Sequence, residues 1–164
     1  MQEAMNNPKL KTAMFGAGCF WGVEATFQQT KGVVATAVGY AGGETENPTY
    51  KEVCSDGTGH AEVVFLRYDP NEISYDELLK VFYENHNPTT WNRQGPDVGS
   101  QYRSVVFYYD EDQKQAAERM KKTVDESGKW SNPVVTQIVE EAPFYRAEEY
   151  HQKYLEKRGM LQCH

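Results

Sequence analysis

The segment GAGCFWG at residues 16–22 contains the side chain best suited to chemistry, the thiol of Cys19. This segment joins a run with the pattern of a strand to a run with the pattern of a helix, which places Cys19 at the helix N-terminus. The unpaired N–H groups and the dipole of a helix N-terminus stabilise a thiolate, the reactive form of cysteine. We therefore interpret Cys19 as a nucleophile. A small buried thiol that fills a gap in the core is the structural alternative.

The same glycines could instead belong to a dinucleotide-binding turn. Their spacing is G-x-G-x-x-x-G rather than G-x-G-x-x-G, and the strand predicted at residues 33–40 has no acidic residue to bind a ribose. Phe20 and Trp21 would also crowd a pyrophosphate. We therefore exclude a nucleotide site and expect no cofactor.

A second reactive group is Glu62, at the head of an apolar run. In a strand, side chains alternate between the two faces, so Glu62 shares a face with Val64 and Leu66. Such neighbours desolvate a carboxyl, raise its pKa and can keep it protonated as a general acid. A glutamate that reaches into water from a strand end fits the pattern equally well.

Three further polar residues, Tyr50, Asp97 and Tyr102, lie in or beside two long segments, 41–59 and 87–101, without periodicity. Connections longer than about 12–15 residues are uncommon unless they have a function or are disordered. Each of the three residues, taken alone, is more typical of a surface loop or of packing than of catalysis. Only their placement in the fold can bring them into a site.

Alternating apolar runs, helical periodicity and capping residues predict the elements that must position these residues. The predicted elements are strands at 11–15, 33–40, 61–68, 104–109 and 134–139, and helices at 19–30, from Ser74, and from Asp110 to Gly128. The order β-α-β-β-α-β followed by α-β predicts an α/β (α+β) sandwich. We expect a mixed sheet with a ferredoxin-like nucleus, an additional helix and strand, and a coiled C-terminal tail.

This topology brings the candidate residues to one edge of the sheet. The first strand ends at that edge, its helix runs away from it, and the second strand returns to it. Segment 41–59 therefore lies at this edge, and the same alternation places segment 87–101 there as well. We expect Cys19, both segments and the starts of strands 61–68 and 104–109 to converge.

Composition excludes several classes of protein. A net charge of −7 makes nucleic acid or an anionic membrane a poor partner for these 164 residues. No apolar run reaches the ~18 residues of a membrane span, and the polar start has no signal-peptide core, so we expect a cytoplasmic protein. Three cysteines cannot all pair within one chain, and the four histidines have no metal-site spacing, so we expect reduced thiols and no metal. The length fits one catalytic domain, 1–164, with a flexible start at 1–10.

Five motifs, in this order, resemble the peptide methionine sulfoxide reductase A family, over residues 12–155. They are GCFWG at 18–22, YKEVC at 50–54, GHAE at 59–62, NRQG at 92–95 together with DVGSQYRS at 97–104, and YHQKYL at 150–155. The chain departs from the family pattern after Ser55, where the usual glycine is replaced, and at Trp91, Pro96 and Arg146. None of these departures removes a functional side chain.

The resemblance implies a thiol-dependent reductase that converts methionine S-sulfoxide, free or in proteins, to methionine. Cys19 corresponds to the cysteine that attacks the sulfoxide sulfur, and Glu62 to the acid that protonates the oxygen. Tyr50 and Tyr102 correspond to the tyrosines that hydrogen-bond this oxygen, and Asp97 to a supporting aspartate.

The family's pocket for the substrate methyl group corresponds to Phe20 and Trp21, with Tyr150 as a further candidate. Plain core packing is the alternative for these aromatics. Two other functions also fit the residues: peroxide reduction, which needs a reactive cysteine but no methyl pocket, and a binding domain whose cysteines only pack.

The resemblance further implies a second thiol that condenses with the sulfenic acid on the nucleophile. Cys163, on a mobile tail at 156–164, is the candidate for this resolving cysteine. A thioredoxin-like donor would then reduce the disulfide. We expect Cys54 to be a buried spectator, although a part in resolution stays open, and we expect the protein to act as a monomer.

Overall fold

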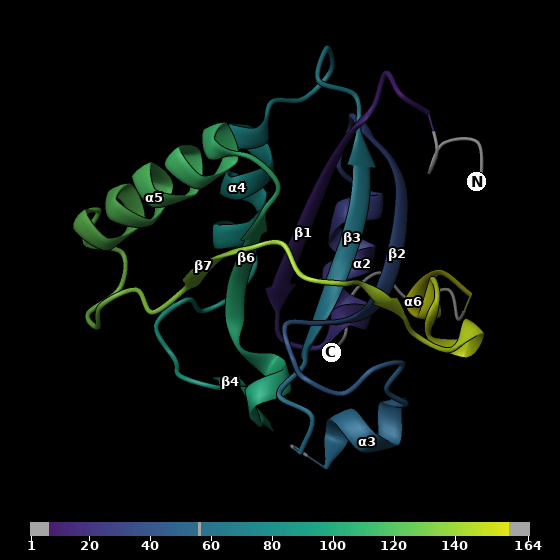
Figure 1. Cartoon of the computed structure of the whole chain (residues 1–164). Coiled ribbons are helices and arrows are strands. Elements are labelled where there is room, and N and C mark those ends of the chain that lie inside the picture. The colour runs from purple at the N-terminus through teal and green to yellow at the C-terminus, as the bar shows by residue number, and fades with distance from the viewer. Residues whose placement is uncertain (1–6, 56, 158–164) are drawn as a thin grey trace.

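Six strands form one mixed sheet in the order β7-β6-β1-β3-β2-β8 (Figure 1). The computed structural model describes residues 7–55 and 57–157. The strands are β1 (Lys11–Ala17), β2 (Val33–Ala41), β3 (Ala61–Tyr68), β6 (Ser104–Tyr108), β7 (Gln137–Glu140) and β8 (Tyr145–Arg146). Neighbours among β6, β1, β3 and β2 are antiparallel, whereas β6 and β7 are parallel. This arrangement confirms the predicted fold class, a mixed sheet around a β-α-β-β-α-β nucleus.

Three helices pack against one face of this sheet and enclose the main core. They are α2 (Phe20–Gln28), α4 (Tyr75–Glu84) and α5 (Glu111–Glu126). Phe15 of β1 stacks on Phe27 of α2 and on Phe82 of α4, with ring centroids 5.4 and 5.1 Å apart. On the other face, the segment between β7 and β8 crosses the sheet (Figure 1) and covers a smaller apolar cluster.

The predicted caps of α4 and α5 are present. Ser74 Oγ accepts a hydrogen bond from the Glu77 N–H, and the Glu77 carboxylate accepts one from the Ser74 N–H, both at 3.1 Å. This reciprocal pair is the capping box expected from the sequence. Asp110 caps α5 by accepting a 2.8 Å hydrogen bond from the Gln113 N–H.

The last predicted strand is shorter than expected and begins at Gln137 rather than Val134. The N–H of Val134 donates to Asp125 Oδ1 at 2.9 Å, and the N–H of Val135 donates to the Pro88 carbonyl at 2.8 Å. Because these donors bond outside the sheet, pairing with β6 starts only after them.

The long segments contain short elements that are too brief to show periodicity. Segment 41–59 includes α3 (Tyr50–Cys54), and segment 87–101 includes β4 (Arg93–Gln94), β5 (Asp97–Val98) and most of the 3-10 helix η1 (Ser100–Tyr102). The chain after β8 forms η2 (Glu149–His151) and α6 (Tyr154–Lys157). The β4–β5 turn has φ 57° at Gly95, and a positive φ at this position is what two-residue hairpin turns require.

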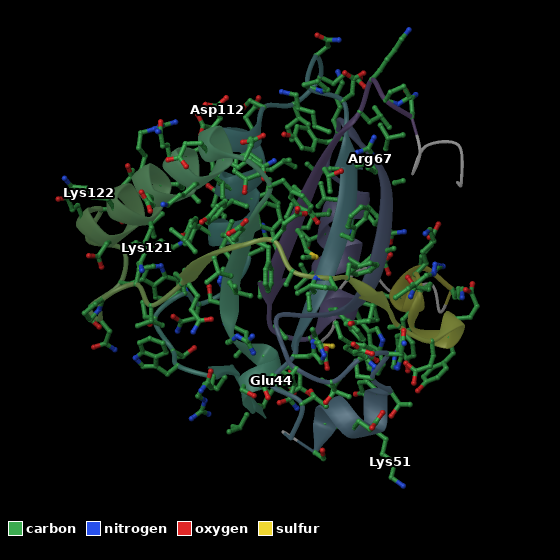
Figure 2. All side chains as sticks on the ribbon, in the orientation of Figure 1. Glu44, Lys51, Arg67, Asp112, Lys121 and Lys122 are labelled. Carbon is green, nitrogen blue, oxygen red and sulfur yellow. The ribbon has the colours of Figure 1, made fainter. Side chains whose placement is uncertain are left out.

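Charged side chains such as Lys51 on α3 and Lys122 on α5 point away from the sheet (Figure 2). Within the described ranges, no helix has both the length and the apolar character needed to cross a membrane. The cellular location stays a prediction.

Candidate active site

The end of β1, the start of α2, the start of β3 and both long segments meet at one edge of the sheet, the lower edge in Figure 1. The Phe20 N–H donates a 3.2 Å hydrogen bond to Glu62 Oε1, which joins α2 to β3. The charges of Cys19, Glu62 and Asp97 act on the hydroxyl of Tyr102, so these four residues lie near one another at the same edge. The structure therefore brings together candidates that are far apart in the sequence.

Cys19 is the N-cap residue of α2 and is partly exposed. Gly18 before it has φ 94°, in the left-handed region that favours glycine. A Cβ at Gly18 would also lie only 2.8 Å from the side chain of Gln94. The first turn of α2 contains no acidic residue, so no carboxylate within that turn offsets the positive end of the helix dipole at Cys19.

Gln94 fixes the β4–β5 hairpin beside this turn. Its side-chain oxygen accepts a 2.7 Å hydrogen bond from the Asn87 N–H, and its amide nitrogen donates a 2.8 Å bond to the Asn87 carbonyl. Asp97 is the cross-strand partner of Gln94, and directly opposite residues of an antiparallel pair project to the same face. Asp97 therefore faces the turn that carries Cys19.

Glu62 is buried, with only 1% of its surface exposed. It lies on the face of β3 that carries Val64 and Leu66, as strand alternation predicts. Burial, with the charge of Asp97 in addition, raises the pKa of Glu62 to about 8, although the hydrogen bond from Phe20 opposes this shift. Its Oε2 is buried and has no hydrogen-bond partner among the described residues. Because this pKa lies above 7, the carboxyl of Glu62 is largely protonated at neutral pH.

Tyr50 is held in place by the start of α3. Thr49 and Glu52 form a capping box at this helix. The N–H of Tyr50 donates a 3.0 Å hydrogen bond to Glu148, which also accepts one from the Tyr40 hydroxyl at 3.0 Å. Glu148 thereby ties α3 to β2 and to the C-terminal segment, a role that the sequence did not indicate.

The hydroxyl groups of Tyr50 and Tyr102 stay protonated. Burial raises the pKa of both, assisted at Tyr50 by its hydrogen bond with Cys54 and at Tyr102 by the charge of Glu62. Both hydroxyls can therefore donate hydrogen bonds to an oxygen bound near Glu62.

The expectation that Cys54 is buried is wrong. Cys54 is the last residue of α3 and is exposed. We expected burial because Cys54 precedes a predicted strand, but β3 begins only at Ala61, seven residues later. The thiol of Cys54 lies one helical turn after Tyr50 and shares a hydrogen bond with its hydroxyl.

Aromatic side chains form a cage next to Cys19. The ring centroids of Phe20, Trp21 and Tyr50 are 6.4–6.5 Å apart. Phe20 is buried, whereas Tyr150 is 55% exposed and packs in a tilted arrangement against His151, with ring centroids 4.0 Å apart. Tyr150 therefore lies at the rim of the cage.

Two residues that hold Trp21 in place, His151 and Tyr154, were not predicted as site residues from the sequence. The Trp21 Nε1–H donates a 2.9 Å hydrogen bond to Nδ1 of His151, which is completely buried. The ring of Tyr154 stacks on the indole with centroids 3.8 Å apart. Because Nδ1 of His151 accepts this hydrogen bond, the neutral imidazole carries its hydrogen on Nε2. The only signal was the motif YHQKYL, from which no pairing across 130 positions can be deduced.

Cys163, the predicted resolving cysteine, lies outside the described residues. The nearest described chain is α6, where Leu155 is buried and Glu156 accepts a 3.0 Å hydrogen bond from Gln28 of α2. The last described helix, α6, is therefore anchored on α2. In the part of the chain that the structure describes, no group of three or more His, Cys, Asp or Glu could hold a metal.

Solved structures of similar proteins share this fold. The reduced form of Mxr1 from Saccharomyces cerevisiae is 37% identical, with a TM-score of 0.88 over 94% of this chain and 88% of that chain. Methionine sulfoxide reductase A of Corynebacterium diphtheriae is 38% identical, with a TM-score of 0.85 over 94% of this chain and 77% of that chain. A complex of Mxr1 with Trx2 matches with a TM-score of 0.65 at 26% identity, over 91% of this chain and 87% of that chain.

Proteins with similar sequences are also methionine sulfoxide reductases. The peptide methionine sulfoxide reductase MsrA of Methanosarcina acetivorans is 58% identical over 93% of this chain and 81% of its own length. The MsrA of Geobacter metallireducens is 56% identical over 95% of this chain and 96% of its own length. The sequence profile of peptide methionine sulfoxide reductase matches residues 11–164. The chain therefore belongs to the peptide methionine sulfoxide reductase family.

Proposed function

We propose that this chain reduces methionine S-sulfoxide to methionine, with Cys19 as the nucleophile and Glu62 as the acid. The observation that carries the proposal is the pairing of a thiol at a helix N-terminus with a buried carboxyl whose free oxygen lies at the same edge. The names of the related proteins support the same reaction. In this proposal, residues 1–164 act as one catalytic domain and as a monomer.

In the first step, the thiolate of Cys19 attacks the sulfoxide sulfur. Glu62 donates its proton to the sulfoxide oxygen, and the hydroxyls of Tyr50 and Tyr102 stabilise the charge that develops there. The oxygen ends on the cysteine as a sulfenic acid, and methionine leaves with two electrons supplied by the cysteine sulfur. Asp97 supports this step because, in addition to burial, its negative charge raises the pKa of Glu62 and so helps to keep that carboxyl protonated.

The aromatic cage accounts for recognition of the methyl group. Phe20 and Trp21 offer apolar surface for the S-methyl group, and Tyr150 lies at the rim. A fixed chiral pocket presents only one sulfoxide epimer with its oxygen toward Glu62. We assign this epimer as S from the family.

In the second step, the thiol of Cys163 attacks the sulfenic acid, which releases water and forms a disulfide with Cys19. Cys163 is six residues beyond Lys157, the last residue of α6, and six residues span about 20 Å when extended. This reach exceeds the length of α2, about 14 Å for nine residues. A thioredoxin-like dithiol then reduces the disulfide by exchange. The complex of the related Mxr1 with Trx2 supports such a donor.

Turnover of the two purified epimers of N-acetyl methionine sulfoxide, with dithiothreitol as the reductant, tests this proposal. We expect methionine product from the S epimer and at least 100-fold slower turnover of the R epimer. Equal turnover of both epimers contradicts the proposed pocket. Peroxide consumption without sulfoxide reduction supports a peroxidase, and inactivity toward both substrates supports a binding domain.

A further inference from the structure

A cleft outside the aromatic cage opens beside Cys19. It has a volume of about 420 Å³ and lies between α2, the C-terminal end of α4 and the β4–β5 hairpin. This volume is within the range of ligand pockets, about 300–1,000 Å³. The proposed chemistry uses only Cys19 and Asp97 of its lining, so most of the cleft has no role in it.

The cleft and the aromatic cage flank α2 from two sides. Val23 and Thr26 line the cleft, whereas Trp21 stacks on Tyr154 and Gln28 bonds to Glu156. Residues three or seven apart on a helix share a face, and at 100° per residue these two pairs project to opposite sides. A substrate whose sulfoxide lies at Cys19, with its methyl group in the cage, can therefore extend into the cleft.

The length of the cleft fits a peptide better than a single amino acid. From Cys19 to Thr26, α2 rises about 10 Å at 1.5 Å per residue. An extended chain of about three residues covers the same distance. The bound methionine sulfoxide occupies the cage, so the cleft is left for residues that precede or follow it.

The lining of the cleft is acidic. Glu84 and Asp97 belong to it, and among residues 7–55 and 57–157 no lysine, arginine or histidine does. The nearest basic group along the hairpin, the guanidinium of Arg93, donates a 3.1 Å hydrogen bond to the Gly95 carbonyl. Arg93 pairs with Val98, so its side chain lies on the opposite face of the hairpin from Asp97.

Apolar groups complete the site. Val23 and Pro96 line it together with the buried rings of Phe27 and Phe82. A lysine or arginine can pack its aliphatic stem on such a surface while its charged end reaches a carboxylate.

We propose that this cleft binds the polypeptide that flanks an oxidised methionine and prefers lysine or arginine within three residues of it. This inference rests on the proposed function and adds a substrate class, protein segments with basic flanks. Glu84 is the specificity-determining residue that the proposed chemistry does not use.

Blocked alanine heptapeptides with a central methionine S-sulfoxide test the inference, with lysine or glutamate at each of the three positions on either side. For each variant, kcat/KM with dithiothreitol is divided by the value for N-acetyl methionine S-sulfoxide. We expect lysine to exceed glutamate by about tenfold at one or more positions on one side, mainly through KM. Because salt screens exposed charges beyond about 10 Å at 0.1 M, the preference should shrink at 0.5 M salt. A ratio below twofold at every position overturns the proposal.

Matched variants locate the preference. Glu84→Gln should lower the lysine-to-glutamate ratio at least threefold, whereas Glu118→Gln, the same charge change at an exposed position of α5, should leave it unchanged.

Thr26→Phe should fill the cleft and lower peptide turnover about tenfold relative to the small substrate, whereas Gln29→Phe, outside the cleft, should not. Equal ratios in a variant and its control overturn the cleft assignment.

The two proposals fail separately. Wild-type protein that does not reduce N-acetyl methionine S-sulfoxide contradicts the proposed function. Wild-type protein that reduces it but treats all peptides alike contradicts only the cleft.

Discussion

The N–H of Phe20 donates a hydrogen bond to Oε1 of Glu62 across 42 positions of sequence. This bond connects the first residue of α2, directly after Cys19, to the carboxyl at the start of β3. The separation of Cys19, the proposed nucleophile, from Glu62, the proposed acid, is thus held by a main-chain N–H rather than by two flexible side chains. The other oxygen of Glu62, Oε2, has no hydrogen-bond partner among the described residues, and in the proposed reaction it faces the sulfoxide.

The raised pKa of Glu62 predicts how the reductive step depends on pH. The carboxyl is largely protonated at pH 7, because its pKa is about 8. We predict that methionine release in a single turnover slows as the pH rises through about 8. Rapid-quench measurements across this range check the prediction.

Glu62→Gln tests the same carboxyl by substitution. Glutamine has no proton to transfer, so we expect a loss of about 10²–10⁴-fold at pH 7 and no slowing near pH 8. A loss smaller than tenfold, or slowing that persists in the variant, assigns Glu62 to packing.

The same carboxyl predicts a pH-dependent effect on stability. A glutamate ionises near pH 4.5 when unfolded but near pH 8 in this fold. Between these values the unfolded chain holds fewer protons than the folded one, so the free energy of unfolding falls as the pH rises, by up to about 1.4 kcal/mol per unit. Glu62→Gln lacks this loss, and its stability gain over wild type should grow from pH 5 to pH 8.5. Urea unfolding measures the difference, and a gain independent of pH would count against the raised pKa.

Removal of either tyrosine hydroxyl should slow the reductive step. Tyr50→Phe and Tyr102→Phe each leave one donor to the sulfoxide oxygen, so we expect losses of about 10–100-fold, and a larger loss in the double variant. Tyr109→Phe serves as the control, because Tyr109 directly follows the end of β6 that lies away from this edge. Single-turnover rates within twofold of wild type in both single variants would refute the assignment.

The two remaining cysteines should behave differently. Cys163→Ser should release one methionine per chain and then stall with thioredoxin, because no disulfide forms. Cys54→Ser should turn over near the wild-type rate. Stalling of Cys54→Ser instead would transfer the resolving role to α3.

Residues with local signals were predictable from the sequence. The alternation of side chains along β3 predicts that Glu62 points to the same face as Val64 and Leu66. The change from strand to helix pattern at the GAGCFWG segment predicts that Cys19 lies at the start of α2. The order of elements predicts that both long segments reach the same edge, because each strand and helix reverses the direction of the chain. These inferences need only periodicity and chain connectivity.

Other features depend on contacts between distant segments. Nothing in the neighbourhood of Trp21 indicates that His151 and Tyr154 hold its ring, since these residues are 130 or more positions away. The exposure of Cys54 was missed because α3 has only five residues, too few to show a helical period. The cleft beside Cys19 is likewise formed by three elements and has no signature in any of them.

Location of the sulfoxide oxygen after one turnover tests the central claim most directly. The variant Cys54→Ser/Cys163→Ser is mixed with methionine S-sulfoxide and dimedone in the absence of reductant and is then analysed by peptide mass spectrometry. We predict one methionine released per chain and a dimedone adduct on Cys19. Methionine release with Cys19 unlabelled, or no release at all, contradicts the assignment of Cys19 as the nucleophile.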